Sequence, residues 1–109
     1  MIITYRHLDS CCENIFSWDT AKDATNKRLS GRPSFELASF IFHDPTHLTD
    51  FNRTSRGEDR EQTLGKIGST VFFVVHSIRI IDNVETIRII SARKATKSEV
   101  RAYIQRTRA

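Results

Sequence analysis

The strongest structural signal in this 109-residue sequence is a pair of β-strand patterns in its second half. Residues 70–77 hold the uninterrupted run Val-Phe-Phe-Val-Val, and β-branched and aromatic residues of this kind favour a central strand of a sheet. Residues 85–91 form a second such pattern, and the Asp82-Asn83 turn joins the two. This part of the chain is therefore predicted to form an antiparallel sheet.

Helical patterns lie on both sides of these strands. Asp19 has the side chain of a helix N-cap, and Gly31 ends that helix. Ser34 caps a second helix, which Asp44-Pro45 ends because the residue before proline avoids helical geometry. The last helix begins at the capping box Thr96-Lys97-Ser98-Glu99. Two helices, about four antiparallel strands and a C-terminal helix predict an α+β fold.

The other segments carry weaker patterns. Residues 61–67 are predicted to form a modest strand that turns at Gly68-Ser69, and residues 15–18 a short extended piece. The polar residues 52–59 indicate an exposed loop, and residues 1–14 a loosely held arm. Because no linker, repeat or low-complexity tract divides the chain, residues 1–109 are expected to form one domain.

The positive charge is concentrated at one end of the chain. Residues 93–109 carry six basic side chains and one acidic side chain, so this segment is +5 and the rest of the chain is −1. Such a segment suits RNA phosphates or an acidic protein, although a solvated helix without a partner has the same composition.

Two further observations concern where the protein acts. The sequence holds no long apolar run that would span a membrane and no signal peptide, so a cytoplasmic protein without a membrane partner is expected. Cys11 and Cys12 are adjacent, and an ordinary disulfide needs a wider Cα separation. They are expected to be reduced thiols.

A series of motifs between residues 16 and 103 resembles the BrnT family of ribonuclease toxins, which have a RelE-like fold. The motifs are Phe16-Ser17-Trp18-Asp19 with Lys22 and Asn26; Ser34-Phe35-Glu36 with Ala38, Phe42 and Asp44-Pro45; Ser55-Arg56-Gly57-Glu58-Asp59-Arg60 with Leu64-Gly65; Val74-Val75 with Arg79; Arg88-Ile89-Ile90-Ser91-Ala92-Arg93; and Ala95-Thr96 with Glu99 and Tyr103. Their order and spacing carry the resemblance, and the motif from Arg88 to Arg93 is the most specific of them.

The resemblance implies an endoribonuclease toxin of a type II toxin–antitoxin system, which inhibits translation and growth. It also implies a BrnA-like antitoxin that neutralises the toxin, a complex of two toxins with two antitoxins, and contact with operator DNA only through the antitoxin.

The sequence departs from the family pattern at three places. Leu29-Ser30-Gly31 stands where relatives commonly have Lys-His-Gly, Thr54 where they have histidine, and Val100 where they have arginine. These departures favour an alternative, a non-catalytic toxin relative that acts as an RNA- or protein-binding module. A DNA-binding regulator is a third reading, but no helix-turn-helix with a basic recognition helix can be placed.

Four arginines are predicted to hold the phosphate during metal-independent RNA cleavage: Arg60, Arg79, Arg88 and Arg93. A guanidinium can donate two parallel hydrogen bonds to a phosphate, and an antiparallel sheet can gather these positions on one surface. Alternation along residues 85–91 places Ile87 and Ile89 on one face and Arg88 with Ile90 on the other. The structural alternative for Arg88 is a salt bridge to Glu58 or Glu85.

The acid–base group has two candidates, Glu58 and His76. His76 shares a strand face with Val74 and Phe72, so a core position is its alternative, and Glu58 can instead position Arg60. Further RNA contacts are predicted for Lys94, Lys97, Arg101, Ser55 and Tyr103, with packing as the alternative for Tyr103. No metal and no cofactor is expected, because Asp44-Pro45 separates the one pair of histidines at helical spacing.

Overall fold

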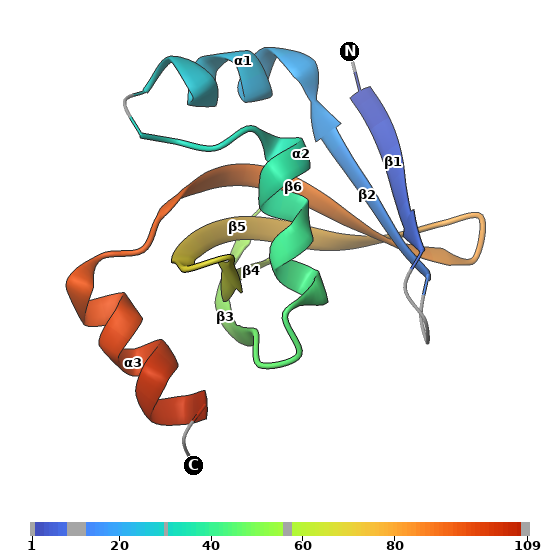
Figure 1. Ribbon diagram of the computed structural model, residues 1–109. Coiled ribbons are helices and arrows are strands. Elements are labelled where there is room, and N and C mark those ends of the chain that lie inside the picture. Colours follow the sequence, from blue (N-terminus) through green and yellow to red (C-terminus); the bar gives the residue numbers. More distant parts are fainter. Residues whose placement is uncertain (1, 9–12, 30, 56–57, 108–109) are drawn as a thin grey trace.

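The computed structural model describes residues 2–8, 13–29, 31–55 and 58–107, and describes side chains for residues 15–29, 31–50, 59–80 and 82–106. Along the chain the elements are β1 (Ile2–Leu8), β2 (Glu13–Asp19), α1 (Thr20–Arg28), α2 (Phe35–Ser39), the 3₁₀ helix η1 (Phe40–His43), β3 (Leu48–Ser55), β4 (Glu58–Ile67), β5 (Thr70–Ile81), β6 (Val84–Lys94) and α3 (Lys97–Thr107) (Figure 1).

The strands form one sheet in the order β1-β2-β6-β5-β4-β3, and α2 crosses one of its faces (Figure 1). Neighbouring strands are antiparallel except β2 and β6, which are parallel. The predicted α+β class is confirmed. The described part of the chain contributes six strands to the sheet, where the sequence predicted about four.

Both extra strands lie at the edges of the sheet. Within the segment predicted to be a loop, residues 52–55 instead belong to β3 and residues 58–59 to the beginning of β4, whose backbones pair through Ser55↔Glu58. Edge strands are often polar because charged side chains protect them from unwanted pairing, so a polar sequence did not exclude a strand. The segment predicted as a loose arm contributes β1, which pairs with β2 along its whole length. The prediction of a loose arm was wrong because β-branched and aromatic side chains favour strands, and residues 2–5 are Ile2, Ile3, Thr4 and Tyr5.

The predicted turns and caps are present. Asp82 and Asn83 both have positive φ, at 51° and 65°, as a tight hairpin of two residues requires. The side chain of Asp19 accepts a hydrogen bond from the Ala21 amide, and Ser34 caps α2. At α3 the Thr96 amide donates to the Glu99 carboxylate at 2.8 Å, and the Glu99 amide donates to the Thr96 hydroxyl at 3.2 Å. The capping box is therefore reciprocal.

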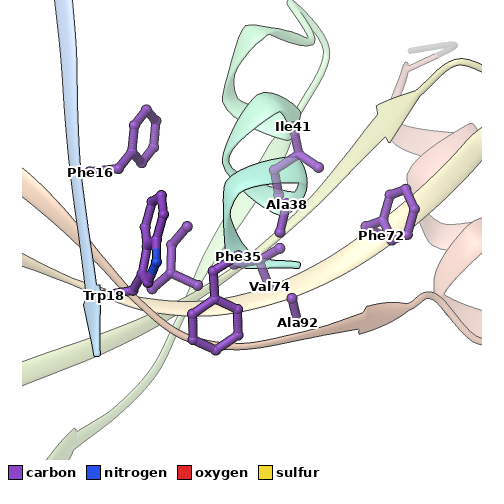
Figure 2. Packing of buried hydrophobic residues seen from close by; sticks show 9 residues of the cluster. Phe16, Trp18, Phe35, Ala38, Ile41, Phe72, Val74 and Ala92 are labelled. Carbon is purple, nitrogen blue, oxygen red and sulfur yellow. The ribbon is translucent and has the colours of Figure 1, made fainter. Parts of the chain in front are cut away.

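The hydrophobic core lies between the sheet and the helices α2 and η1. Its members are Phe16, Trp18, Phe35, Ala38, Ile41, Phe72, Val74, Ile89 and Ala92, and Figure 2 shows them converging from β2, α2, η1, β5 and β6. Gly65 of β4 permits the close approach of η1, because a Cβ there would lie 2.6 Å from the Cβ of Ile41. The core therefore defines one face of the sheet as the inner face.

Within the described residues, no helix is long and apolar enough to cross a membrane.

Candidate functional site

The strand β5 separates core residues from polar residues by simple alternation. Phe72, Val74 and His76 lie on the inner face, where the first two belong to the core. Ser77 and Arg79 consequently lie on the opposite face, which we call the outer face. The residue that opposes Ser77 on β6 is Arg88. Cross-strand partners share a face, so Arg88 also belongs to the outer face.

A row of directly paired positions crosses the outer face through five strands. Ser17 of β2 pairs with Arg88 of β6, Arg88 with Ser77 of β5, Ser77 with Arg60 of β4, and Arg60 with Arg53 of β3. We call these positions the arginine row. Strands lie about 4.8 Å apart, so the Cα atoms of Arg88 and Arg60 are roughly 10 Å apart. The sheet thus brings two of the predicted arginines together with Ser77 between them.

Ser77 separates Arg88 from Arg60, Ser17 lies at the β2 end of the row, and both serines are buried. Ser77 is 0% exposed and Ser17 is 5% exposed, while Arg60 and Arg88 are half-buried. A small side chain between two long ones leaves the guanidinium stems room to lie along the sheet. Arg79 is exposed two residues beyond Ser77, and its register partner on β6 is Thr86. Three of the four predicted arginines therefore share the outer face near one another.

Arg88 and Arg60 carry charges that the described side chains do not neutralise. Among those side chains, no carboxylate lies within 4.0 Å of either guanidinium. Glu85, one of the two predicted partners of Arg88, is exposed and pairs in register with Ile80 instead. The side chain of Glu58, the other predicted partner, lies outside the described residues. A half-buried guanidinium without a carboxylate partner is suited to bind an anion.

His76 lies on the inner face, away from the arginine row. Its side chain is 1% exposed, its Nε2 is 2.7 Å from the Thr63 hydroxyl, and Phe42 packs edge-on against its ring. Burial, followed by the nearby His47, lowers the pKa of His76 to about 4. Nδ1 has no hydrogen-bond partner among the described residues. His76 is thus a neutral core histidine, and the sheet separates it from the phosphate-binding candidates.

Arg93 lies on the outer face but serves the last helix. Its two terminal nitrogens donate to the two carboxylate oxygens of Glu99 at 2.8 and 3.0 Å, and its guanidinium stacks over the Phe73 ring at 4.1 Å. The hydrogen bond that Arg93 donates to Glu99 raises the pKa of Arg93, and the same bond lowers the pKa of Glu99. The bonds between these two side chains join α3 to β6. Arg93 is therefore not part of the arginine row.

Tyr103 is buried and anchors α3 to the segment after η1. Its hydroxyl donates to the Asp44 carboxylate and lies 2.8 Å from the Thr46 hydroxyl. Burial and the bond to Asp44 raise the pKa of Tyr103. This geometry leaves no open ring face for an RNA base, so the packing alternative holds for Tyr103.

The remaining predicted RNA contacts lie around the two ends of the sheet. Lys94 ends β6 and is exposed, as are Lys97 and Arg101 on α3. Ser55 and Glu58 pair with each other at the β3–β4 connection, and their side chains lie outside the described residues.

Two positions to which the sequence interpretation assigned no role in the site also belong to it. Arg53 occupies the β3 end of the arginine row, and the prediction of a loop over residues 52–59 concealed its strand position. Asn26 is buried, and its amide donates to the carbonyls of Ala92 and Pro33 at 2.9 and 3.1 Å. The Asn26 side chain thus bonds to the backbone of β6 beyond the point where the pairing of β6 with β2 ends.

No group of three or more His, Cys, Asp and Glu side chains capable of holding a metal is found in the part of the chain that the structure describes.

A family model confirms the resemblance seen in the motifs. The model describes the ribonuclease toxin, BrnT, of type II toxin–antitoxin systems, and it matches residues 18–99. The chain belongs to this family. The matched region of this BrnT toxin runs from Trp18 in the core to Glu99 in the α3 cap, and it contains Arg60, Arg79 and Arg88. No curated protein matches the chain.

Proposed function

We propose that this BrnT toxin cleaves RNA on the outer face of its sheet, without a metal ion. The observation that carries the proposal is Arg88, a half-buried arginine between Ser17 and Ser77 in the arginine row, with no carboxylate partner among the described side chains. Because the chain belongs to a family of ribonuclease toxins, we expect the anion that Arg88 binds to be an RNA phosphate.

Arg88 and Arg60 would hold the non-bridging oxygens of the scissile phosphate, and Ser77 between them leaves room for the phosphate to approach the sheet. The 2′-oxygen of the preceding ribose attacks phosphorus after losing its proton, and the bond to the 5′-oxygen breaks. The products are a 2′,3′-cyclic phosphate and a 5′-hydroxyl, whose proton comes from solvent on this open face. Preorganised positive groups stabilise the charge that develops on the phosphate oxygens.

Glu58 is the proposed base that removes the 2′-proton. It begins β4 two residues before Arg60, and the core position and low pKa of His76 leave it as the remaining acid–base candidate of the two.

The proposed partners follow from the family. A BrnA-like antitoxin would cover the outer face or α3 and neutralise the charge that RNA needs, in a complex of two toxins and two antitoxins. The toxin would act in the cytoplasm, and operator DNA would be contacted through the antitoxin.

The non-catalytic alternative is favoured by one structural observation. His76 is withdrawn into the core, and Thr54 stands where relatives commonly have histidine, so neither position offers an imidazole to the outer face. A protein that binds RNA through the arginine row but leaves it intact would fit this alternative.

Purified protein incubated with RNA in the presence of a chelator separates the two functions. Wild-type protein is expected to cleave the RNA, and Arg88→Ala to reduce the rate about 100-fold, the scale seen when one donor to a transition-state oxyanion is removed. Arg28→Ala, which removes an exposed arginine of α1, is the matched control and is expected to retain full activity. Bound but intact RNA with the wild-type protein would support the binding module instead.

A further inference from the structure

A pocket opens beside the arginine row, at the point where β2 leaves the sheet. The last paired positions of β2 and β6 are Ser17 and Arg88. Beyond them α1 lies alongside β6 (Figure 1), fixed by the hydrogen bonds between Asn26 and the backbone of Ala92. The cavity between α1 and β6 has a volume of about 320 Å³ and is lined by Ala21, Lys22, Thr25, Asn26, Leu29, Arg32 and Ile90.

The apolar side of the pocket is formed by Leu29 and Ile90. Leu29 is the C-cap residue of α1 and is 48% exposed, so part of its side chain is accessible to a ligand. Ile90 is the extra residue of a β-bulge, because Val75 pairs with Ser91 and His76 with Ile89. The bulge leaves Ile90 without a register partner on β5, and its side chain lines the pocket.

The other side of the pocket carries two cations. Lys22 is exposed, and Arg32 donates to the Asn26 side-chain oxygen at 3.2 Å. Within the described side chains, no carboxylate lies within 4.0 Å of either positive group. Asn26 thus orients Arg32 at the rim and leaves the other guanidinium nitrogens for a ligand.

We propose that this pocket binds one nucleotide of the RNA, next to the phosphate held by Arg88. The base would pack against Leu29 and Ile90, and Lys22 and Arg32 would hold the adjoining phosphate. The volume is at the lower end of the range for ligand pockets, which suits a single nucleotide. Ile90 lies two residues beyond Arg88 along β6, about 7 Å, so the bound nucleotide would be a direct neighbour of the cleaved bond.

This inference rests on the proposed cleavage at the arginine row, and it assigns sequence preference to a different set of residues. A pocket that accepts one base next to the cleaved bond makes the identity of that base matter for the cleavage rate. Arg88 and Arg60, which contact only phosphate, would act on any sequence.

The test is a titration of the full-length protein with each of the four 5′-ribonucleoside monophosphates, followed by amide NMR shifts. Saturable shifts at Ala21, Leu29 and Ile90 are expected, larger for at least one nucleotide than for inorganic phosphate. Lys22→Gln should raise the dissociation constant about tenfold by removing a charge-assisted bond. Lys27→Gln is the matched control, because Lys27 lies on the same helix, pairs with Asp23 at 3.7 Å and does not line the pocket.

A second variant, Leu29→Glu, places a carboxylate in the pocket at an exposed position where the fold tolerates it. It should abolish the nucleotide-dependent shifts and change the distribution of cut sites in an RNA of mixed sequence. Shifts no larger than those with inorganic phosphate, or an unchanged cut-site distribution in Leu29→Glu, would overturn the pocket. If the wild-type protein binds a nucleotide there but cuts no RNA, the cleavage proposal fails and the pocket stands.

Discussion

The two faces of the sheet differ in whether they carry charge, and consecutive residues of β5 show the difference. His76 points into the core, where the Thr63 hydroxyl satisfies one nitrogen and burial keeps the ring neutral. Ser77 lies on the outer face between Arg88 and Arg60, which have no carboxylate partner among the described side chains. The inner face therefore stabilises the fold, whereas the outer face keeps charge available for a ligand.

The largest expected contrast in stability lies between neighbouring residues of β6. Ile89 is 1% exposed in the core, so Ile89→Ala should lower the free energy of unfolding by roughly 2–5 kcal/mol. Arg88→Ala on the outer face should change it by less than about 1 kcal/mol, because no buried partner is left behind. Urea unfolding of both variants measures the difference, and equal losses would mean that Arg88 is a structural residue.

His76 should make the inner face sensitive to acid. Its pKa is about 4 in the folded protein and about 6.5 when unfolded, so the unfolded chain binds more protons between these values. The stability contributed by the neutral ring is complete above pH 6.5 and is lost as the pH falls toward 4, by ~3 kcal/mol in total.

The variant His76→Gln removes this titration while keeping a polar group that can bond to Thr63. Its unfolding free energy should depend less steeply on pH between 4 and 6.5 than that of the wild type. An unchanged slope would show that His76 is not the group responsible.

A smaller effect is expected where α3 meets the loop after η1. Tyr103→Phe removes the hydroxyl that bonds to Asp44 and Thr46 and should cost about 1 kcal/mol of unfolding free energy. Burial opposes ionisation of Asp44, but bonds from Tyr103, Thr46 and the Lys66 amide outweigh it and lower its pKa. The stability from Asp44 is therefore present above its unfolded pKa and lost as the pH falls through the folded value.

In Tyr103→Phe the folded pKa of Asp44 should move back toward its unfolded value, so that acid-dependent loss should be smaller than in the wild type, which thermal unfolding across an acid series can measure. RNA binding should be the same as in the wild type. A clear loss of RNA affinity in this variant would mean that Tyr103 contacts RNA and does not serve packing alone.

Local patterns in the sequence were sufficient for the helices, turns and central hairpin, because caps, positive-φ turns and β-branched runs act over a few residues. The face of Arg88 also followed from alternation with Ile87 and Ile89, both of which pack in or against the core. The strand β3 escaped prediction because its sequence is polar at a sheet edge, and a bulge between Phe51 and Arg53 interrupts its register.

The roles of individual site residues were harder to predict because they depend on distant partners. Arg93 and Arg88 stand in the same motif, yet among the described side chains Arg93 alone of the two meets a carboxylate, which a later helix supplies. The bulge at Ile90 and the pocket that this residue lines with α1 likewise depend on pairing with distant segments. The row itself needs the pairing of five strands, including the parallel pair β2–β6.

The most direct test of the outer face as the reactive surface is RNA cleavage in chelator by two variants, Arg88→Ala and His76→Gln. Arg88 pairs across the sheet with Ser77, the residue that follows His76, so the two variants change opposite faces of the sheet at neighbouring positions. Both should be assayed below their unfolding temperatures at pH 7.5, where His76 is neutral. We predict that Arg88→Ala loses about 100-fold in rate and that His76→Gln stays within about twofold of the wild type. Full activity in Arg88→Ala, or its loss in a folded His76→Gln, would contradict the assignment.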